Sequence, residues 1–481
     1  MVSTPQQEAV RKEARKYTSR AFDAASRGDR TSGWRAPGSS ANAESQNALS
    51  LLRARSRELT RNDAYAAAAV RVIQANVVGT GIRAQLPGES EAETVWREWA
   101  ETTDCDADSC HDFYGLQNLI MRSIAESGEV LVRMRPRRRA DGLPVPMQLQ
   151  VLEADHLDTL KDGVVDENGN RLIQGVEFDA LGRRRGYWLF RTHPGDRSMG
   201  VDLNSVFVPA DQILHLYRKD RPGQVRGIPW SAPVAIRLRE LRDYEDAQLI
   251  RQKIAACFAA FRVEAADAFD PIDKSSDGEA KSDQELAIEF FTPGMIVDIA
   301  AGKDIKFATP PMVQGYDEFL ERHLRAVAVG FGVSYESLTA DLRRTSFSSG
   351  RIGQLEFQRN VGTWQRTLMI GQFCRQVWRW FQSAGALVEV DGLEGARPTW
   401  VAPKREMLDP TREIPAEIAA VRAGMKSLTQ VIEATGHTRE EVFALLKAER
   451  DQAQADGLTL ESDPAQAKEW RMPDRAAADL T

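Results

Sequence analysis

SAPVAIRLRELRDYEDAQLIRQKIAACFAAF, residues 231–261, predicts one long helix with a single apolar stripe. Apolar side chains recur at steps of three or four, and charged residues fill most positions between them. The stripe consists of Val234, Leu238, Leu241, Tyr244, Ala247, Ile250, Ile254, Cys257 and Phe261. Ser231 is a suitable N-cap, and Pro233 fits the first turn. Such a rod is about 45 Å long. We therefore expect its stripe to pack against other helices, of this chain or of another copy.

The composition excludes several classes of protein. The 481 residues suffice for about three domains. The net charge of −7 argues against a general nucleic-acid binder, because phosphate affinity requires an excess of Lys and Arg. Only four cysteines occur, which favours a reducing compartment. No run approaches ~18 uninterrupted apolar residues and the N-terminus lacks an apolar signal core, so the sequence predicts neither a membrane span nor a secretory signal.

The chain before the long helix predicts an α+β domain, with helices first and an antiparallel sheet after them. Residues 1–42 form a polar arm rich in turn residues, which we expect to be flexible. Helical patterns cover 44–78, 89–102 and 111–127. Alternating patterns then predict strands at 130–135, 148–152, 171–178, 186–191, 205–208 and 212–217.

Charged and metal-ligating residues gather at a few places in this domain. Arginine triplets at 137–139 and 183–185 stand at expected hairpin tips, close to Arg133 and Arg135. They are either solvated turns or contacts for DNA or an acidic partner. Cys105 with Cys110 and His111 matches a zinc site poorly, so we interpret that segment as a loop before an Asp112 helix cap. The remaining cluster that could serve a metal-dependent phosphoesterase is Glu153, Asp155, His156 and Asp158.

An acidic run separates the long helix from a second one. Residues 264–285 carry eight acidic residues against two lysines, which cannot bury a core alone. Short strand-like pieces follow, and a helix is predicted at 316–331 with His323 on its apolar face, interpreted as a core or interface histidine. A third long helix is predicted at 354–385, with Trp364, Trp378 and Trp380 as core or subunit-interface residues.

Several short blocks together resemble the lambda-type portal proteins of tailed bacteriophages. The most telling is GFGVSYESLTAD at 330–341, followed by TSFSSGR at 345–351. The others are RND at 61–63, NVVGTG at 76–81, SGEVLVR at 127–133, RGIPW at 226–230, Asp409-Pro410, Glu413, GMKSL at 424–428 and Gly436. The resemblance spans roughly residues 10–450, and the combination is specific although no single block is.

The resemblance implies a mainly helical α+β portal fold with wing, stem, clip and crown, assembled as a ring that is typically dodecameric. Such a ring sits at one capsid vertex of the virion, after assembly in the host cytoplasm, and conducts double-stranded DNA during packaging and ejection. The implied partners are the large terminase subunit, major capsid and scaffold proteins, and head-completion or adaptor proteins. No enzymatic activity, cofactor, metal or membrane is implied.

Carried over by position, the resemblance divides the chain into nine parts. These are an arm (1–42), wing (43–225), first stem helix (226–263), clip (264–314), second stem helix (315–333), tunnel-loop region (334–353), long wing helix and strand (354–400), crown helices (401–463) and a disordered tail (464–481).

Three sets of site residues follow from this division. The loop facing DNA contains Arg343, Arg344, Thr345, Ser346, Phe347, Ser348 and Ser349. The stem contacts between copies use Leu238, Leu241, Ile250, Ile254, Phe261, Phe319, Leu324 and Val327. Docking to the clip uses Asp270, Asp273, Asp277, Glu279 and Asp283. The loop chemistry suits weak, repeated phosphate contacts, because tight binding would stall moving DNA.

Two alternatives from other classes stay open at this point. One is a metal-dependent nuclease or phosphoesterase that uses Asp155, His156 and Asp158. The other is a monomeric adaptor that docks through its acidic segment. A ring without catalytic activity distinguishes the portal hypothesis from both.

Overall fold

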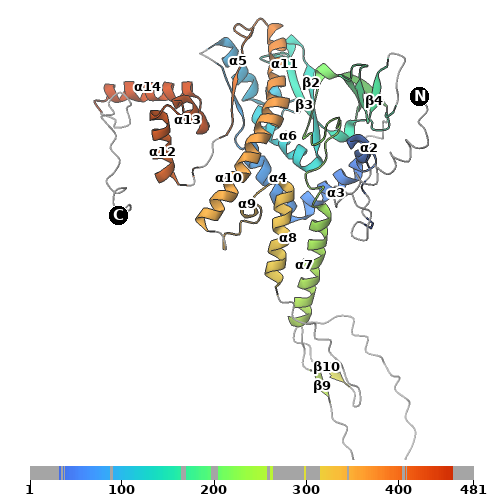
Figure 1. Cartoon of the computed structure of the whole chain (residues 1–481). Helices are drawn as coiled ribbons and strands as arrows, with labels where there is room; N and C mark the ends of the chain where they lie inside the picture. The colour runs from blue at the N-terminus through green and yellow to red at the C-terminus, as the bar shows by residue number, and fades with distance from the viewer. Residues whose placement is uncertain are drawn as a thin grey trace, which may run out of the picture.

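The computed structural model describes residues 32, 33, 36, 38–86, 90–163, 169–196, 204–256, 261–263, 297–299, 315–343, 346–403, 407 and 409–458. Most of the expected arm, clip and tail therefore lies outside the described residues. The described part is a mainly helical α+β body from which two helices project, as Figure 1 shows. This fold class agrees with the sequence prediction. None of the described helices is long and apolar enough to cross a lipid bilayer.

The N-terminal half of the body begins with helices. The single helix predicted at 44–78 is in fact divided into three, with breaks at 47–48 and at Asp63. Asp63 adopts an extended backbone, and its carboxylate caps the next helix through the amide of Ala66. Asp112 caps α6 as predicted, accepting from the amide of Gly115 at 2.7 Å. The helices are α2 (Ala41–Gln46), α3 (Leu49–Asn62), α4 (Ala64–Val77), α5 (Glu91–Ala100) and α6 (Phe113–Ser127), with the short η3 (Thr103–Cys105) between the last two.

Two antiparallel sheets follow the helices. The first has the order β3-β2-β8, and the second has the order β4-β5-β6-β7. The predicted strand 171–178 is a hairpin, because Gln174 and Gly175 both have positive φ and turn the chain. The strands are β2 (Glu129–Pro136), β3 (Met147–Glu153), β4 (Arg171–Ile173), β5 (Val176–Phe178), β6 (Arg184–Phe190), β7 (Ser205–Pro209) and β8 (Ile213–Tyr217), with η4 (Arg139–Asp141), η5 (Ala154–His156) and η6 (Ala210–Gln212) beside them.

The projecting pair consists of α7 (Ala235–Ala256) and α8 (Tyr316–Phe331), which lie side by side below the body in Figure 1. The second matches its predicted bounds. The first is shorter than predicted at both ends. Residues 231–234 form turns, and Phe261–Val263 is a strand, β9, that pairs in parallel with β10 (Val297–Ile299).

The C-terminal half returns to the body as a long helical rod. It comprises α10 (Phe347–Trp364), a π-helical segment (Gln365–Cys374) and α11 (Arg375–Ala386), preceded by the short α9 (Tyr335–Thr339). A two-stranded sheet joins β1 (Arg83–Gln85) to β11 (Thr399–Val401). Three further helices stand beside the body in Figure 1: α12 (Pro410–Arg422), α13 (Leu428–Ala434) and α14 (Arg439–Ala455).

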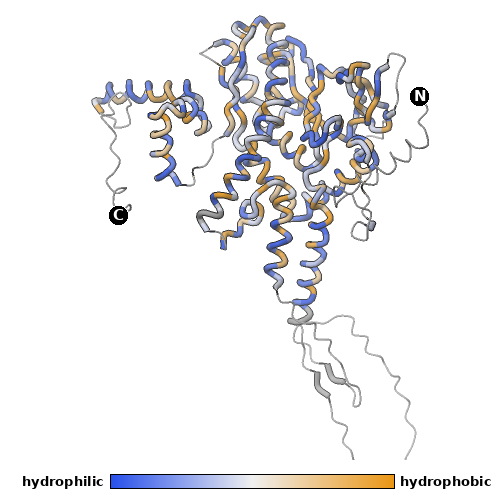
Figure 2. Tube along the Cα trace, viewed as in Figure 1, coloured by the Kyte–Doolittle hydropathy of each residue, from blue (hydrophilic) through white to orange (hydrophobic). Residues whose placement is uncertain are grey.

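The core lies where the helices cover the first sheet. Trp96 is its aromatic centre, with Phe113, Trp378 and Phe381 at edge-on ring distances of 4.9–5.3 Å. Trp364 and Trp378 are buried, as predicted for core residues, and Nε1 of Trp380 donates to the carbonyl oxygen of Asp211 at 2.7 Å. A smaller apolar cluster fills the space between the two sheets. In contrast to these apolar clusters, the projecting helices α7 and α8 carry a mixture of apolar and polar residues along their length, as Figure 2 shows.

Candidate functional site: the projecting helices, their root and the adjoining loop

One side of the upper half of the α7–α8 pair is buried against the body. Leu238, Leu241, Leu324 and Val327 are at most 3% exposed within one chain. The turn before α7 approaches α8 so closely that a Cβ on Gly330 would lie 2.3 Å from Cγ1 of Val234. The prediction that these four side chains contact another copy is therefore corrected, because their own chain already covers them.

The lower half of the pair is held by aromatic contacts. The rings of Tyr244 and Tyr316 stack 6.0 Å apart, and Phe319 lies 4.9 Å from Tyr244. His323 packs on Phe319 at 4.2 Å, and its Nδ1 lies 3.3 Å from the guanidinium of Arg237. Burial, and then the charge of Arg237, lower the pKa of His323. A neutral imidazole between two helices agrees with its interpretation as an interface histidine within the chain.

Exposed apolar side chains remain on the surface of the pair. We name as the outer apolar set Ile236, Leu249, Ile250 and Val329, which are 53–78% exposed. Ile236 and Ile250 are 14 residues apart, about four helical turns, so they share one side of α7. Among the predicted contacts between copies, Ile250 and Phe319 are exposed. The side chains of Ile254 and Phe261 lie outside the described residues.

A buried carboxylate organises the root of the pair. Glu129 begins β2 and is fully enclosed. Its oxygens accept from Arg226 at 2.6 and 3.0 Å and from Arg53 at 3.0 Å. They also accept from Nε2 of His215 and from the amide of Gly227, both at 2.8 Å. The sequence analysis did not identify this network, although Glu129 and Arg226 lie in two of the blocks that carry the resemblance.

The electrostatics of the network follow from its enclosure. Burial alone would raise the pKa of Glu129, but Arg226, His215 and Arg53 outweigh it and hold that pKa well below its ordinary value. Burial lowers the pKa of His215 below 6.5 despite its bond to Glu129. The network therefore holds an ionised Glu129 between two arginines, with a neutral histidine that donates from Nε2 because a carboxylate only accepts.

Two glycines, Gly128 and Gly227, allow the two backbone segments that carry Glu129 and Arg226 to approach each other closely, because neither glycine has a Cβ atom. A Cβ on Gly128 would lie 2.4 Å from the carbonyl carbon of Ile228, and one on Gly227 would lie 2.2 Å from the oxygen of Gly128. Ser231, predicted as the cap of α7, instead bonds Oγ of Ser56 on α3 at 2.7 Å, since α7 begins only at Ala235. The network thus connects α3 and β2 to the segment that leads into α7.

The loop expected to face DNA follows α9 directly. The carboxylate of Asp341 accepts from Nε and an Nη of Arg343 at 2.9 and 2.8 Å, and these bonds and the charge of Asp341 raise the pKa of Arg343. The Arg343 side chain is nevertheless 84% exposed. Because α10 already begins at Phe347, the loop is shorter than predicted. Arg344, Thr345 and the side chains of residues 347–349 lie outside the described residues, whereas Ser346 is exposed.

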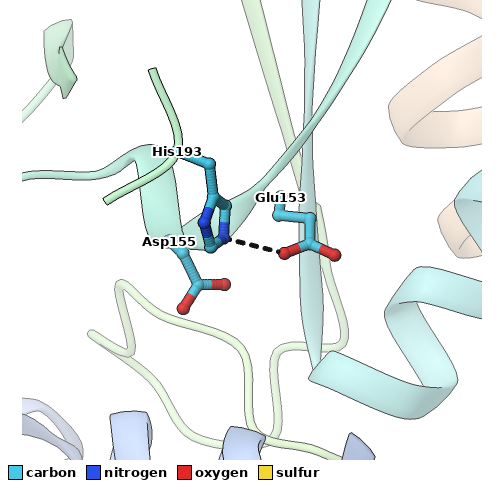
Figure 3. A group of neighbouring side chains, drawn as sticks. All are labelled: Glu153, Asp155 and His193. Carbon is cyan, nitrogen blue, oxygen red and sulfur yellow. Dashed lines mark ion pairs between the residues drawn. The ribbon is translucent and has the colours of Figure 1, made fainter. Parts of the chain in front are cut away.

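The structure divides the cluster that suggested a phosphoesterase. Figure 3 shows Glu153 and Asp155 beside His193, whose Nε2 lies 3.0 Å from Glu153. Both carboxylates also pair with Arg57, at 3.0 and 2.7 Å, and Asp155 pairs with Arg53. His156 and Asp158 are engaged elsewhere: Nδ1 of His156 contacts the carbonyl oxygen of Phe190, and Asp158 accepts from Ser205. The four residues are therefore not one site, and two of the carboxylates, those of Glu153 and Asp155, pair with arginines.

Two other sequence features have structural explanations. The Cys110 segment is a loop whose backbone amides donate to the carboxylate of Asp106. In the second arginine triplet, Arg184 donates to the hydroxyls of Tyr187 and Tyr217 at 3.0 and 2.6 Å, so it is not a solvated tip. The docking residues Asp270, Asp273, Asp277, Glu279 and Asp283 all lie outside the described residues.

Comparison with known proteins finds several relatives with the same description. The probable portal protein of Halomonas phage phiHAP-1 is 26% identical over 416 residues, which cover 82% of this chain and 78% of the relative. The portal protein of Escherichia phage N15 is 22% identical, covering 90% and 89%. Portal protein B of Escherichia phage lambda is 22% identical, covering 84% of each.

Solved structures give a distant likeness. A chain in the neck of a native gene transfer agent particle, computed with C12 symmetry, matches with a TM-score of 0.42 and 13% identity, covering 79% of this chain and 93% of that one. The sequence profile described as phage portal protein, lambda family, matches residues 27–365, which is well over half of the chain. The protein therefore belongs to the lambda family of phage portal proteins, structural components of the virion and not enzymes.

Proposed function

We propose that copies of this chain assemble side by side into a ring, typically of twelve, through which double-stranded DNA passes during packaging and ejection. The observation that carries this proposal is the outer apolar set on α7 and α8. Exposed apolar side chains on a projecting rod favour contact with another surface, and identical neighbours in a ring supply one for every copy.

The parts of the ring follow from the described elements. In this proposal α7 and α8 form the stem, the helices and sheets before α7 together with α10–α11 form the wing, and α12–α14 form the crown. The acidic segment 264–314 is the clip, where the large terminase subunit and the head-completion or adaptor proteins dock. Major capsid and scaffold proteins contact the ring at the capsid vertex.

Imaging the purified protein tests this assembly. Negative-stain electron microscopy of the full chain is expected to give rings with a central hole. Light scattering is expected to give the mass of many copies and not of one 53.6 kDa chain. Single compact molecules under all conditions of salt and concentration would contradict the proposal and favour the monomeric adaptor.

Charge reversal in the loop tests its contact with DNA. Replacing Arg343 and Arg344 with Glu is expected to reduce the length of packaged DNA while leaving the ring intact, because each copy loses two phosphate contacts and gains two repulsive charges. The expected loss is partial, since Asp341 already offsets part of the charge of Arg343. Replacing Arg359, an exposed arginine on α10 paired with Glu356, with Glu is the matched control. Packaging of full-length DNA by the loop variant would remove the loop from the proposal.

A further inference from the structure

A cavity of about 240 Å³ lies at the edge of the space between the two sheets. Arg133, Arg135 and Arg191 line it, together with Gln150 and His156. Arg133 and Arg135 are two residues apart on β2 and so share one face of the strand, and Gln150 on β3 lies directly opposite Arg133. The rest of the wall is apolar. The strand β2 and the segment that follows β6 thus bring three cations to one cavity.

The positive charge in this cavity has no partner within the described residues. No aspartate or glutamate is among the residues that line it. Most arginines in ion pairs elsewhere have a carboxylate within 3.5 Å, as Arg53, Arg57 and Arg226 do. Throughout the described part of the chain, Arg133, Arg135 and Arg191 form no ion pair.

Arg133 is the clearest sign of a missing ligand. Its Nε is buried and has no hydrogen-bond partner among the described residues. Burial, and then the like charge of Arg135, lower the pKa of Arg133. A buried donor without an acceptor is costly, and two neighbouring cations without an anion add to that cost. An anion that accepts from Nε and offsets both charges relieves each of these costs.

We propose that this cavity binds an oxyanion of the phosphate class. Guanidinium groups present paired N–H donors that match the oxygens of phosphate. A doubly charged phosphate also compensates three arginines better than a single carboxylate does. The volume is about eight times the ~30 Å³ that one water molecule occupies, which leaves space for a phosphate group with several waters. This inference does not depend on the ring, because all of its residues belong to one chain.

Calorimetry with inorganic phosphate tests the site in the full-length protein. In phosphate-free buffer at constant ionic strength, the wild type is expected to bind one phosphate per chain with saturation and to unfold at a higher temperature when phosphate is added. Arg133→Gln is expected to weaken binding by about tenfold or more and to abolish that rise in temperature. It is not expected to lower the unfolding temperature without phosphate, because it removes an uncompensated cation.

The control is Arg138→Gln, which removes the same charge from the same hairpin but outside the cavity. Its phosphate affinity is expected to equal that of the wild type. Equal weakening in both variants would mean that only general surface charge acts, and it would overturn the proposal. Absence of saturable binding to the wild type would overturn it as well.

Competition identifies the source of the phosphate group. If a short DNA duplex displaces inorganic phosphate from the wild type at matched ionic strength, the site takes a backbone phosphate of DNA. If it does not, the site takes a free phosphate or the phosphate of a small molecule, and both results support the proposal. Displacement by a glutamate-rich peptide at lower concentration than phosphate would overturn it, because the cavity would then serve carboxylates of an acidic protein.

Discussion

Glu129→Gln is expected to destabilise the folded chain by about 3–5 kcal/mol, because it leaves Arg226 buried with no counter-charge and removes one of the two carboxylates that pair with Arg53. The neutral amide can also accept only part of the hydrogen bonds that the carboxylate accepts from Arg53, His215, Arg226 and Gly227. A loss of this size is a large fraction of the ~5–15 kcal/mol that stabilises a typical protein. Denaturant unfolding at one fixed protein concentration measures it, since assembly makes apparent stability depend on concentration.

Glu153→Gln is the matched control. Glu153 also pairs with an arginine, Arg57, but its side chain is 54% exposed, so its removal is expected to cost about 1 kcal/mol or less. The double variant Glu129→Gln/Arg226→Met is expected to lose less than the sum of its two single variants, because each single change already removes the ion pair between these two residues. Glu129→Gln with wild-type stability would contradict the role of this network at the root of the α7–α8 pair.

Ile250→Asp is expected to convert the proposed ring into single chains while leaving the fold of each chain intact. Ile250 is 56% exposed in the single chain, so a carboxylate there meets water and costs little before assembly. In the ring that carboxylate would be covered by the next copy, and burying an unpaired charge costs several kcal/mol per contact. The cost recurs at every contact around the ring. Light scattering and negative-stain images measure the loss of assembly.

Gln252→Asp is the matched control for charge on the same helix. Gln252 is an exposed polar residue two positions further along α7, which places it on the other side of the helix. It adds the same charge and is expected to leave the ring intact. Circular dichroism of both variants checks that the chain is still folded. A complete ring formed by the Ile250→Asp variant would exclude this side of α7 from the contact between copies.

Local patterns in the sequence predicted most of the described elements correctly. The period of three to four residues identified α7 and α8, and the Asp112 cap placed the start of α6. Errors occurred where one residue reverses a local trend. Asp63 divides a helix-rich stretch because it caps the following helix, and Gln174 with Gly175 turns a strand-like stretch into a hairpin. A prediction from helix or strand propensity averages over several residues, whereas a cap or a turn depends on one or two residues.

The candidate sites likewise have some features that the sequence predicted and others that only the tertiary structure showed. The order of short blocks led from the sequence alone to the portal family. The sequence analysis placed the apolar residues of the long helix on one stripe, but repeated steps of three wind around a helix of 3.6 residues per turn, so Leu241 and Ile250 lie on opposite sides of α7. The tertiary structure alone decided that Leu238 and Leu241 are buried against the body whereas Ile250 is exposed. It also joined Glu129 to Arg226, 97 residues apart, and placed Arg191 beside Arg133. Burial and ion pairing depend on contacts between residues that are far apart in the sequence, and a local sequence pattern does not contain that information.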